Sequence, residues 1–244
     1  MAEPRTVFVH LLPTLAPAGS LAGGVAVVID VLRATTTIIH ALAAGCKAVY
    51  PCAELEDARL LKSNLRSSGA LLGGERGGRR LADFDLGNSP QEYTPAKCQG
   101  VSLVLTTTNG TRALARATEA DRVLVAGFVN FSAVADRLRL DPRPIHIICA
   151  GTDGEITLED TLLAGAFVDH LSKETDVRLN DSARLAWDCF ARHHHDLPGT
   201  MALSAGGANL RALGYDEDIR TAAQIDTFTL VPELRRDPLR IEVG

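Results

Sequence analysis

Short apolar runs alternate with segments of helical periodicity along most of the chain. The apolar runs have the length of strands and are rich in Val, Ile and Leu. They span residues 25–30, 48–52, 70–74, 101–107, 122–128 and 145–151. Segments with apolar residues at helical spacing follow most of these runs, at 35–44, 54–67, 110–119, 131–140 and 158–173. This alternation is typical of βαβ units and predicts a largely parallel or mixed sheet of at least six strands.

The predicted strands are apolar at successive positions and not only at alternate ones. Leu103, Val104 and Leu105 form such a run. A strand that is buried on both faces of a sheet needs this pattern, because its side chains point alternately to either face. We therefore expect a layered α/β/α fold with helices on both sides of the sheet.

The pattern changes after Glu174. Residues 182–195 have the spacing of an amphipathic helix, Gly and Pro residues then separate short helical pieces, and residues 227–231 read as a last strand. No linker-like composition separates this part from the rest. We expect either a single α/β domain over residues 1–244, or two lobes: an α/β body at about 1–175 and a mostly helical part at about 176–244 packed on it.

Charge and hydropathy exclude several classes of protein. A formal net charge of −5 gives no basic field that would attract nucleic acid or anionic lipid. The longest apolar stretch, 21–31, is shorter than the roughly 20 residues of a membrane-spanning helix. The first residues show no secretory signal, and the five cysteines form no C-x-x-C pair, as expected for reduced thiols. We expect a cytoplasmic protein with a small-molecule partner, no nucleic-acid or membrane partner, and homodimerisation as an open alternative.

Polar clusters directly follow three of the predicted strands. The clusters lie at 30–37, 106–112 and 151–160. In an open parallel sheet, ligands bind beyond the carboxyl ends of the strands. We therefore expect the three clusters to meet in one site.

The second cluster has the features of a phosphate site. It provides hydroxyls, an amide and free backbone N–H groups at a predicted helix start, from Thr107, Thr108, Asn109, Gly110 and Thr111, with Arg112 following. The N-terminus of a helix carries partial positive charge and unpaired donors that bind anions. The alternative is that one threonine caps the helix and the others pack. A cap needs only one hydroxyl, so we favour the anion site.

The first cluster places a carboxylate at the end of a buried strand. Asp30 is followed by Arg33, Thr35 and Thr36. Burial of a carboxylate is costly unless a cation or strong donors face it, and either a divalent metal or Arg33 could do so. The alternative is an Asp that caps the next helix. We take Asp30 and Arg33 as candidate catalytic residues, and Thr35 and Thr36 as candidate substrate-binding residues.

The third cluster is acidic. Asp153, Glu155, Glu159 and Asp160 crowd the segment after Gly151 and Thr152, which we take as substrate-binding candidates. Acids at a helix start can simply complement the helix dipole. However, Mg²⁺ takes one or two carboxylates together with substrate phosphate. Spacing does not choose among the candidate metal ligands, which are Asp30, Glu75, Asp85, Glu159 and Asp160.

Several familiar signatures are absent from the sequence. There is no G-x-x-x-x-G-K-[ST], no G-x-G-x-x-G after a strand and no G-x-S-x-G, which weakens nucleoside triphosphatase, dinucleotide-binding dehydrogenase and serine hydrolase interpretations. The run VVIDVLRAT is similar to the first strand of haloacid-dehalogenase-type phosphatases, which ends in Asp-x-Asp. Here Leu32 occupies the second position, so the general acid is missing and that fold is not expected.

Several motifs in order resemble the 2-phosphosulfolactate phosphatase family. They are DVLRATTT (30–37), GERGG (74–78) with FDLGNSPQEY (84–93), TTTNGTRAL (106–114), CAGTDGEITLEDTLLAG (149–165) and a tail at 204–214. The resemblance extends over roughly residues 24–232. It implies an α/β fold distinct from the haloacid-dehalogenase class and a magnesium-dependent phosphatase of coenzyme M biosynthesis that converts 2-phosphosulfolactate to sulfolactate and phosphate.

The matched motifs add residues to the candidate site. A substrate with phosphate, carboxylate and sulfonate groups needs several donors, and Arg33, Arg76, Arg112 and Asn88 lie within the motifs. The alternatives are a phosphatase for another phosphorylated 2-hydroxy acid, such as phosphoglycolate or phospholactate, and a non-catalytic protein that binds an anionic metabolite.

Overall fold

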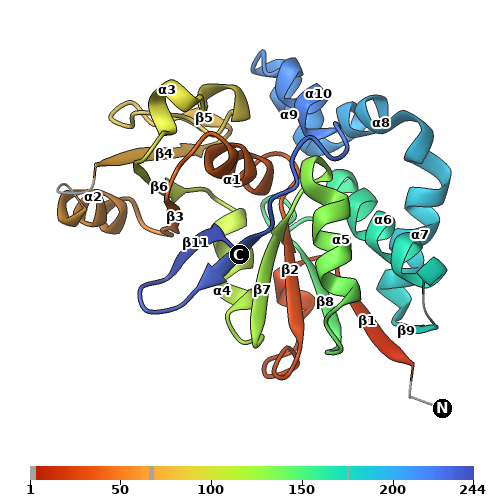
Figure 1. Cartoon of the computed structure of the whole chain (residues 1–244). Helices are drawn as coiled ribbons and strands as arrows, with labels where there is room; N and C mark the ends of the chain where they lie inside the picture. Colours follow the sequence, from red (N-terminus) through yellow and green to blue (C-terminus); the bar gives the residue numbers. More distant parts are fainter. Residues whose placement is uncertain (1–3, 66–68, 175) are drawn as a thin grey trace.

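A mixed sheet with helices on both faces forms the centre of the protein (Figure 1). The computed structural model describes residues 4–65, 69–174 and 176–244. Within these residues the sheet has 11 strands in the order β5-β4-β6-β3-β11-β10-β7-β2-β8-β1-β9. The strands are β1 (Arg5–His10), β2 (Val25–Ile29), β3 (Ala48–Pro51), β4 (Ala70–Arg76), β5 (Arg79–Arg80), β6 (Ser102–Thr106), β7 (Arg122–Ala126), β8 (Ile145–Cys149), β9 (Val177–Leu179), β10 (Pro232–Arg235) and β11 (Arg240–Val243). This confirms the predicted α/β class with a mixed sheet.

The helices follow the predicted alternation through the first part of the chain and dominate the last part. They are α1 (Ala34–Ala43), α2 (Leu55–Asn64), α3 (Pro95–Cys98), α4 (Gly110–Ala117), α5 (Phe131–Arg139), α6 (Leu158–Glu174), α7 (Asp181–His193), α8 (Leu197–Leu203), α9 (Ala205–Ala212) and α10 (Asp216–Ala222). The end of the predicted helix 54–67 lies outside the described residues. In the part of the chain that the structure describes, no helix is both long and apolar enough to cross a bilayer.

The sheet consists of two parallel blocks joined by an antiparallel hairpin. Strands β4, β6 and β3 form one parallel block, and β7, β2, β8, β1 and β9 form the other. The hairpin β10–β11 lies between the blocks and runs antiparallel to β7 on one side and to β3 on the other. The C-terminal strands therefore close the gap between two groups of βα units (Figure 1).

The central strands are buried on both faces, as their continuous apolar sequence predicts. In β2, Val25, Val27 and Ile29 pack into the core that α5, α6 and α7 cover. Ala26 and Val28 pack into the opposite core, which α1 and α4 cover. This alternation places the helices on both faces and leaves the strand ends for the loops that form the site.

One strand prediction was wrong, and several observed strands were missed. Residues 227–231 form no strand. The Phe228 N–H instead donates a hydrogen bond to the carbonyl of Val129, which is distant in the sequence. The strands of this region come later, at β10 and β11. Strand β1 was missed, and it pairs in parallel with β8 and β9. Each of these outcomes depends on pairing with a distant segment, which the local pattern does not specify.

A glycine in α6 allows close packing of that helix against α7. A Cβ added at Gly165 would overlap the carbonyl oxygen of Ala186 in α7. We expect Gly165→Ala to lower the free energy of unfolding by about 1–3 kcal/mol, because the two helices must move apart. Urea denaturation followed by circular dichroism would measure this change. Lys173→Ala, which removes an exposed ion pair with Asp169 on the same helix, is the control and should change it by less than about 0.5 kcal/mol. An equal effect of the two variants would contradict this packing argument.

Candidate active site

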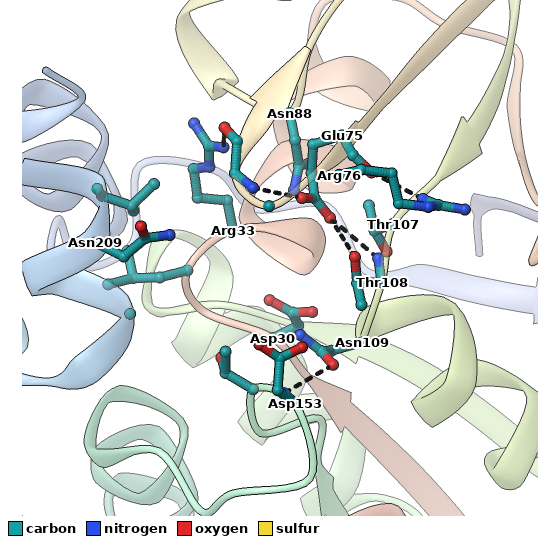
Figure 2. Close-up of a pocket in the computed structure, with 16 residues that line it drawn as sticks. Asp30, Arg33, Glu75, Arg76, Asn88, Thr107, Thr108, Asn109, Asp153 and Asn209 are labelled. Carbon is teal, nitrogen blue, oxygen red and sulfur yellow. Dashed lines mark hydrogen bonds between the residues drawn. The ribbon is translucent and has the colours of Figure 1, made fainter. Parts of the chain in front are cut away.

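The three predicted polar clusters meet at one cavity beyond the carboxyl ends of β2, β6 and β8 (Figure 2). The cavity has a volume of about 300 Å³. Its lining comes from the loops after these strands, from the end of β4 and the β4–β5 turn, from the segment after β5 and from α9. The lining residues are Asp30, Leu32, Arg33, Glu75, Arg76, Gly77, Gly78, Asn88, Thr107, Thr108, Asn109, Thr152, Asp153, Gly206, Asn209 and Leu210. The predicted convergence of the clusters is confirmed, while the roles of the individual residues stay predictions.

Asp30 is buried at the wall of the cavity, where one of its oxygens binds the start of α1. Its Oδ1 accepts a hydrogen bond of 3.1 Å from the N–H of Ala34, the first residue of α1. A Cβ added at Gly110, where α4 begins, would lie 2.9 Å from its Oδ2. Gly110 therefore lets the carboxylate approach the positive end of α4.

The surroundings of Asp30 hold its pKa far above the ordinary value. The pKa is raised to about 7, with burial as the main cause and smaller increases from Glu75 and Glu159. The Ala34 N–H and the Arg33 charge lower it, but not enough to offset burial. Groups whose pKa lies near neutrality in a cavity are often functional.

A carboxylate of the chain itself occupies part of the predicted anion cradle. The Thr108 N–H and hydroxyl donate to Glu75 Oε1 at 3.0 and 3.2 Å, and the Gly78 N–H donates to Glu75 Oε2 at 2.8 Å. Glu75 is the partner of these donors in this structure, and anion binding by Thr108 stays a prediction. The contact also joins the β4–β5 turn to the loop after β6.

Asp153 and Asn109 link the second and third clusters. The Asp153 N–H donates to Asn109 Oδ1 at 3.2 Å. Asp153 has a φ of 52°, in the left-handed region that non-glycine residues seldom adopt. Such backbone strain persists where the surrounding structure imposes it, and it is common at functional sites. Sequence analysis counted Asp153 in the acidic cluster but did not select it as a site residue.

The two acids at the start of α6 lie behind the cavity wall. Asp160 accepts hydrogen bonds from the Val31 N–H at 2.8 Å and from the Gly151 N–H at 3.0 Å, and so ties the loop after β2 to the loop after β8. Glu159 is buried, and its Oε2 has no hydrogen-bond partner among the described residues. Burial raises the pKa of both carboxyls. Asp160, predicted as a metal ligand, thus has both oxygens committed to backbone donors.

Several predicted substrate-binding residues support the loops and do not line the cavity. The Thr35 hydroxyl donates to the Asp30 carbonyl at 2.9 Å, and the Thr36 hydroxyl donates to the Val31 carbonyl at 2.9 Å. Thr111 Oγ1 lies 3.4 Å from the Thr107 hydroxyl. The sequence pattern could not separate these buried hydroxyls from Thr107 and Thr108, which reach the cavity.

Two predicted site residues lie elsewhere on the molecule. Arg112 points to a separate surface hollow beside the segment 13–18, because its position in the first turn of α4 turns it away from Asp30. Asp85 accepts hydrogen bonds from Lys62 Nζ at 2.6 Å and from the Leu72 N–H at 2.7 Å. Neither residue lines the cavity, so the predictions of Arg112 as a substrate donor and Asp85 as a metal ligand are corrected.

The C-terminal helices contribute to the cavity in a way that the sequence did not predict. Gly206, Asn209 and Leu210 of α9 line the cavity. The matched tail at 204–214 was the available signal, but nothing in the local pattern shows which face of this helix meets the loops after the strands.

The two ends of the cavity differ in chemistry. Figure 2 shows Asp30, Asn109 and Asp153 together at one end, and Arg33, Glu75 and Asn88 at the other. Within the described residues no three His, Cys, Asp or Glu side chains come close enough to hold an ion by themselves. Mg²⁺ usually binds one or two carboxylates and keeps several waters for exchange with substrate oxygens. Asp30 and Asp153 fit a site of this kind.

Comparison with known proteins gives one consistent result. A sequence model of a family described as 2-phosphosulpholactate phosphatase matches residues 10–237. A protein of Symbiobacterium thermophilum named "Probable 2-phosphosulfolactate phosphatase" is 43% identical over 217 residues, which are 88% of this chain and 93% of the relative. Proteins with the same name in Caldanaerobacter subterraneus and Synechococcus sp. are 38% and 42% identical, and each match covers 88% of this chain and 89% and 88% of the relative, respectively.

Proposed function

This chain belongs to the 2-phosphosulfolactate phosphatase family, and we propose that it hydrolyses 2-phosphosulfolactate to sulfolactate and inorganic phosphate. The observation that carries the proposal is the meeting of Asp30 with the loops after β6 and β8 at one small polar cavity. Water is the other reactant, and the phosphorus–oxygen bond to the sulfolactate oxygen is the bond that breaks.

We assign the reacting phosphoryl group to the end of the cavity formed by Asp30, Asn109 and Asp153. Asp30 and Asp153 would hold Mg²⁺ there, and the bound ion would neutralise charge on the phosphoryl oxygens. The start of α4 at Gly110 lies beside Asp30, and its positive end favours the same negative charge. Asp30 either attacks phosphorus or holds a proton of the attacking water, and both roles need the ionised carboxylate.

The other end of the cavity suits the non-reacting anionic groups of the substrate. Arg33 lines this end, and guanidinium N–H groups can donate to a carboxylate or a sulfonate. Sequence analysis grouped Arg33 with Asp30 as catalytic. Its place away from Asp30 and Asp153 in Figure 2 favours a role in binding carboxylate or sulfonate.

Arg76 and Glu75 shape the wall between the two ends. Arg76 donates to the Glu75 carbonyl at 2.8 Å and to the Thr106 hydroxyl at 3.1 Å. Glu75 holds the Thr108 and Gly78 donors in place. A substrate anion that binds to Thr108 would take over donors that Glu75 now uses, so we assign Glu75 to this wall and not to the metal.

Phosphate release from a panel of esters tests the proposed function. We expect the purified protein with Mg²⁺ to release phosphate from 2-phosphosulfolactate with a higher kcat/KM than from phospholactate or phosphoglycolate. A higher kcat/KM for phospholactate would assign the enzyme to another phosphorylated 2-hydroxy acid. Binding of these anions without any phosphate release would indicate a non-catalytic binding protein and contradict the proposal.

A further inference from the structure

We infer that Asp218, which does not line the cavity, is a positioning residue that orients Arg33 toward the non-reacting anionic group of the substrate. Asp218 belongs to α10, in the part of the chain to which sequence analysis assigned no site residue. The inference rests on the proposed function for the identity of the substrate. It adds a role for the C-terminal helices that is separate from the chemistry at Asp30.

Both oxygens of Asp218 are committed to groups at the edge of the cavity. Oδ2 accepts a hydrogen bond of 2.7 Å from Arg33 Nη1, and Oδ1 accepts one of 2.6 Å from the Ser89 hydroxyl. Asp218 is 1% exposed. A buried carboxylate with two fixed partners has one orientation, and a short charge-assisted bond transmits that orientation to Arg33.

Two further contacts fix the plane of the Arg33 guanidinium. Nη2 donates to the Gly78 carbonyl at 2.7 Å. The Arg33 Cζ lies 4.4 Å from the centroid of the Tyr215 ring. A guanidinium has five N–H donors in a rigid planar fork. The bonds to Asp218 and Gly78 use two of them, which leaves donors of the same plane for a carboxylate or sulfonate at the cavity.

A purely stabilising role explains this arrangement poorly. A buried ion pair is weak evidence for stability, because the desolvation of two charges offsets most of their attraction. Asp218 binds both Arg33 and Ser89, so these contacts join three segments that are distant in the sequence. Of the three residues, Arg33 lines the cavity. Misplacement of a binding group by about 1 Å can change a rate by roughly 100-fold. Because Asp218 fixes the position of the Arg33 guanidinium, it affects function directly.

Binding of sulfolactate tests the inference without turnover. Sulfolactate carries the carboxylate and sulfonate but no phosphoryl group, so its affinity reports the end of the cavity where Arg33 lies. By titration calorimetry, we expect Asp218→Asn to raise the Kd of sulfolactate about 10–100-fold. The control is Asp216→Asn on the same helix, which removes an exposed acid paired with Arg211 and should leave the Kd within about twofold. Thermal melting of each variant checks that it folds.

Kinetics separates positioning from a general loss of structure. With 2-phosphosulfolactate, Asp218→Asn should raise KM about 10–100-fold and leave kcat within about threefold, because the lost contact is with a non-reacting group. With phenyl phosphate, which lacks that group, kcat/KM should stay within about twofold.

In an Arg33→Gln background, Asp218→Asn should have no further effect on KM, because its effect acts through Arg33. If Asp218→Asn fails to fold, Ser89→Ala removes only the Oδ1 contact and should raise KM by a smaller factor.

The outcomes distinguish this inference from the proposed function. Equal Kd values for sulfolactate in the wild type and Asp218→Asn, or equal losses of kcat/KM on both esters, would overturn the inference. No binding of sulfolactate by the wild type would also overturn it. Binding that depends on Asp218 without phosphate release from 2-phosphosulfolactate would support the positioning role and overturn the proposed hydrolysis.

Discussion

Asp30→Asn is expected to lower kcat for phosphate release from 2-phosphosulfolactate by about 10²–10⁴-fold, the range associated with loss of an acid–base group. The substitution keeps the shape of the side chain and an oxygen that can accept the hydrogen bond from the Ala34 N–H. It removes the ionised carboxylate, which is needed whether Asp30 attacks phosphorus or accepts a proton from water. Steady-state phosphate release, with circular dichroism to verify folding, measures the effect.

Asp85→Asn is the matched control for this prediction. Asp85 was also a candidate metal ligand from the sequence, but it pairs with Lys62 and the Leu72 N–H outside the cavity. We expect its kcat and KM to stay within about twofold of the wild type, because it contacts no group of the site. Retention of normal phosphate release by Asp30→Asn would refute the assignment of Asp30.

Rapid-quench experiments distinguish the two roles of Asp30. If Asp30 attacks phosphorus, a bond forms between its carboxylate oxygen and phosphorus, and the sulfolactate oxygen leaves with its electron pair and takes up a proton. Substrate labelled with ³²P would then label the protein transiently, and water would release the phosphate. If Asp30 accepts a proton from the attacking water, the protein stays unlabelled at all times.

Much of the fold could be predicted because the central strands are buried on both faces. The continuous apolar run in β2 or β8 has few structural solutions, and the helices that follow it have regular periodicity. The hairpin β10–β11 could not be predicted in this way. It contains several charged side chains, such as Glu233, which accepts hydrogen bonds from Arg122 on the neighbouring strand β7. Pairing with β11 and with the distant strand β7 stabilises a strand of this sequence.

The site was predictable where it follows from sheet geometry and unpredictable where it depends on side-chain partners. Asp30 and Thr152 follow β2 and β8, which pair in parallel, so the topology brings them to one edge. Thr108 and Asn109 follow β6 in the other parallel block, and strand pairing alone does not predict that they meet Asp30. Nothing in the spacing shows that Glu75 would take the Thr108 donors, or that Asp160 would bind two backbone N–H groups. Asp30 binds the N–H of Ala34 at the start of α1 and also lines the cavity, so its contact with the helix leaves the proposed catalytic role open to test.

The proposed binding of Mg²⁺ by Asp30 predicts that the effect of this ion on stability depends on pH. Without a cation, burial raises the pKa of Asp30 from 3.8 to about 7. Below pH 3.8 the carboxyl is protonated in both the folded and the unfolded chain, so its burial adds no penalty for a buried charge. As the pH rises above 3.8 the unfolded chain loses this proton first, so this contribution to stability decreases until the folded carboxyl has ionised above pH 7. A cation that binds the ionised form relieves the penalty above pH 7, but must displace a proton below it.

We expect chelation by EDTA to lower phosphate release by at least about 100-fold. We also expect Mg²⁺ to raise Tm more at pH 8 than at pH 5. A cation at about 100 times its Kd adds about 2.7 kcal/mol to the free energy of unfolding, which calorimetric scans at the two pH values would detect as a shift in Tm. Asp30→Asn should lose most of this shift, whereas Asp85→Asn should keep it. A shift of the same size at both pH values, or an unchanged shift in Asp30→Asn, would mean that the cation binds away from Asp30.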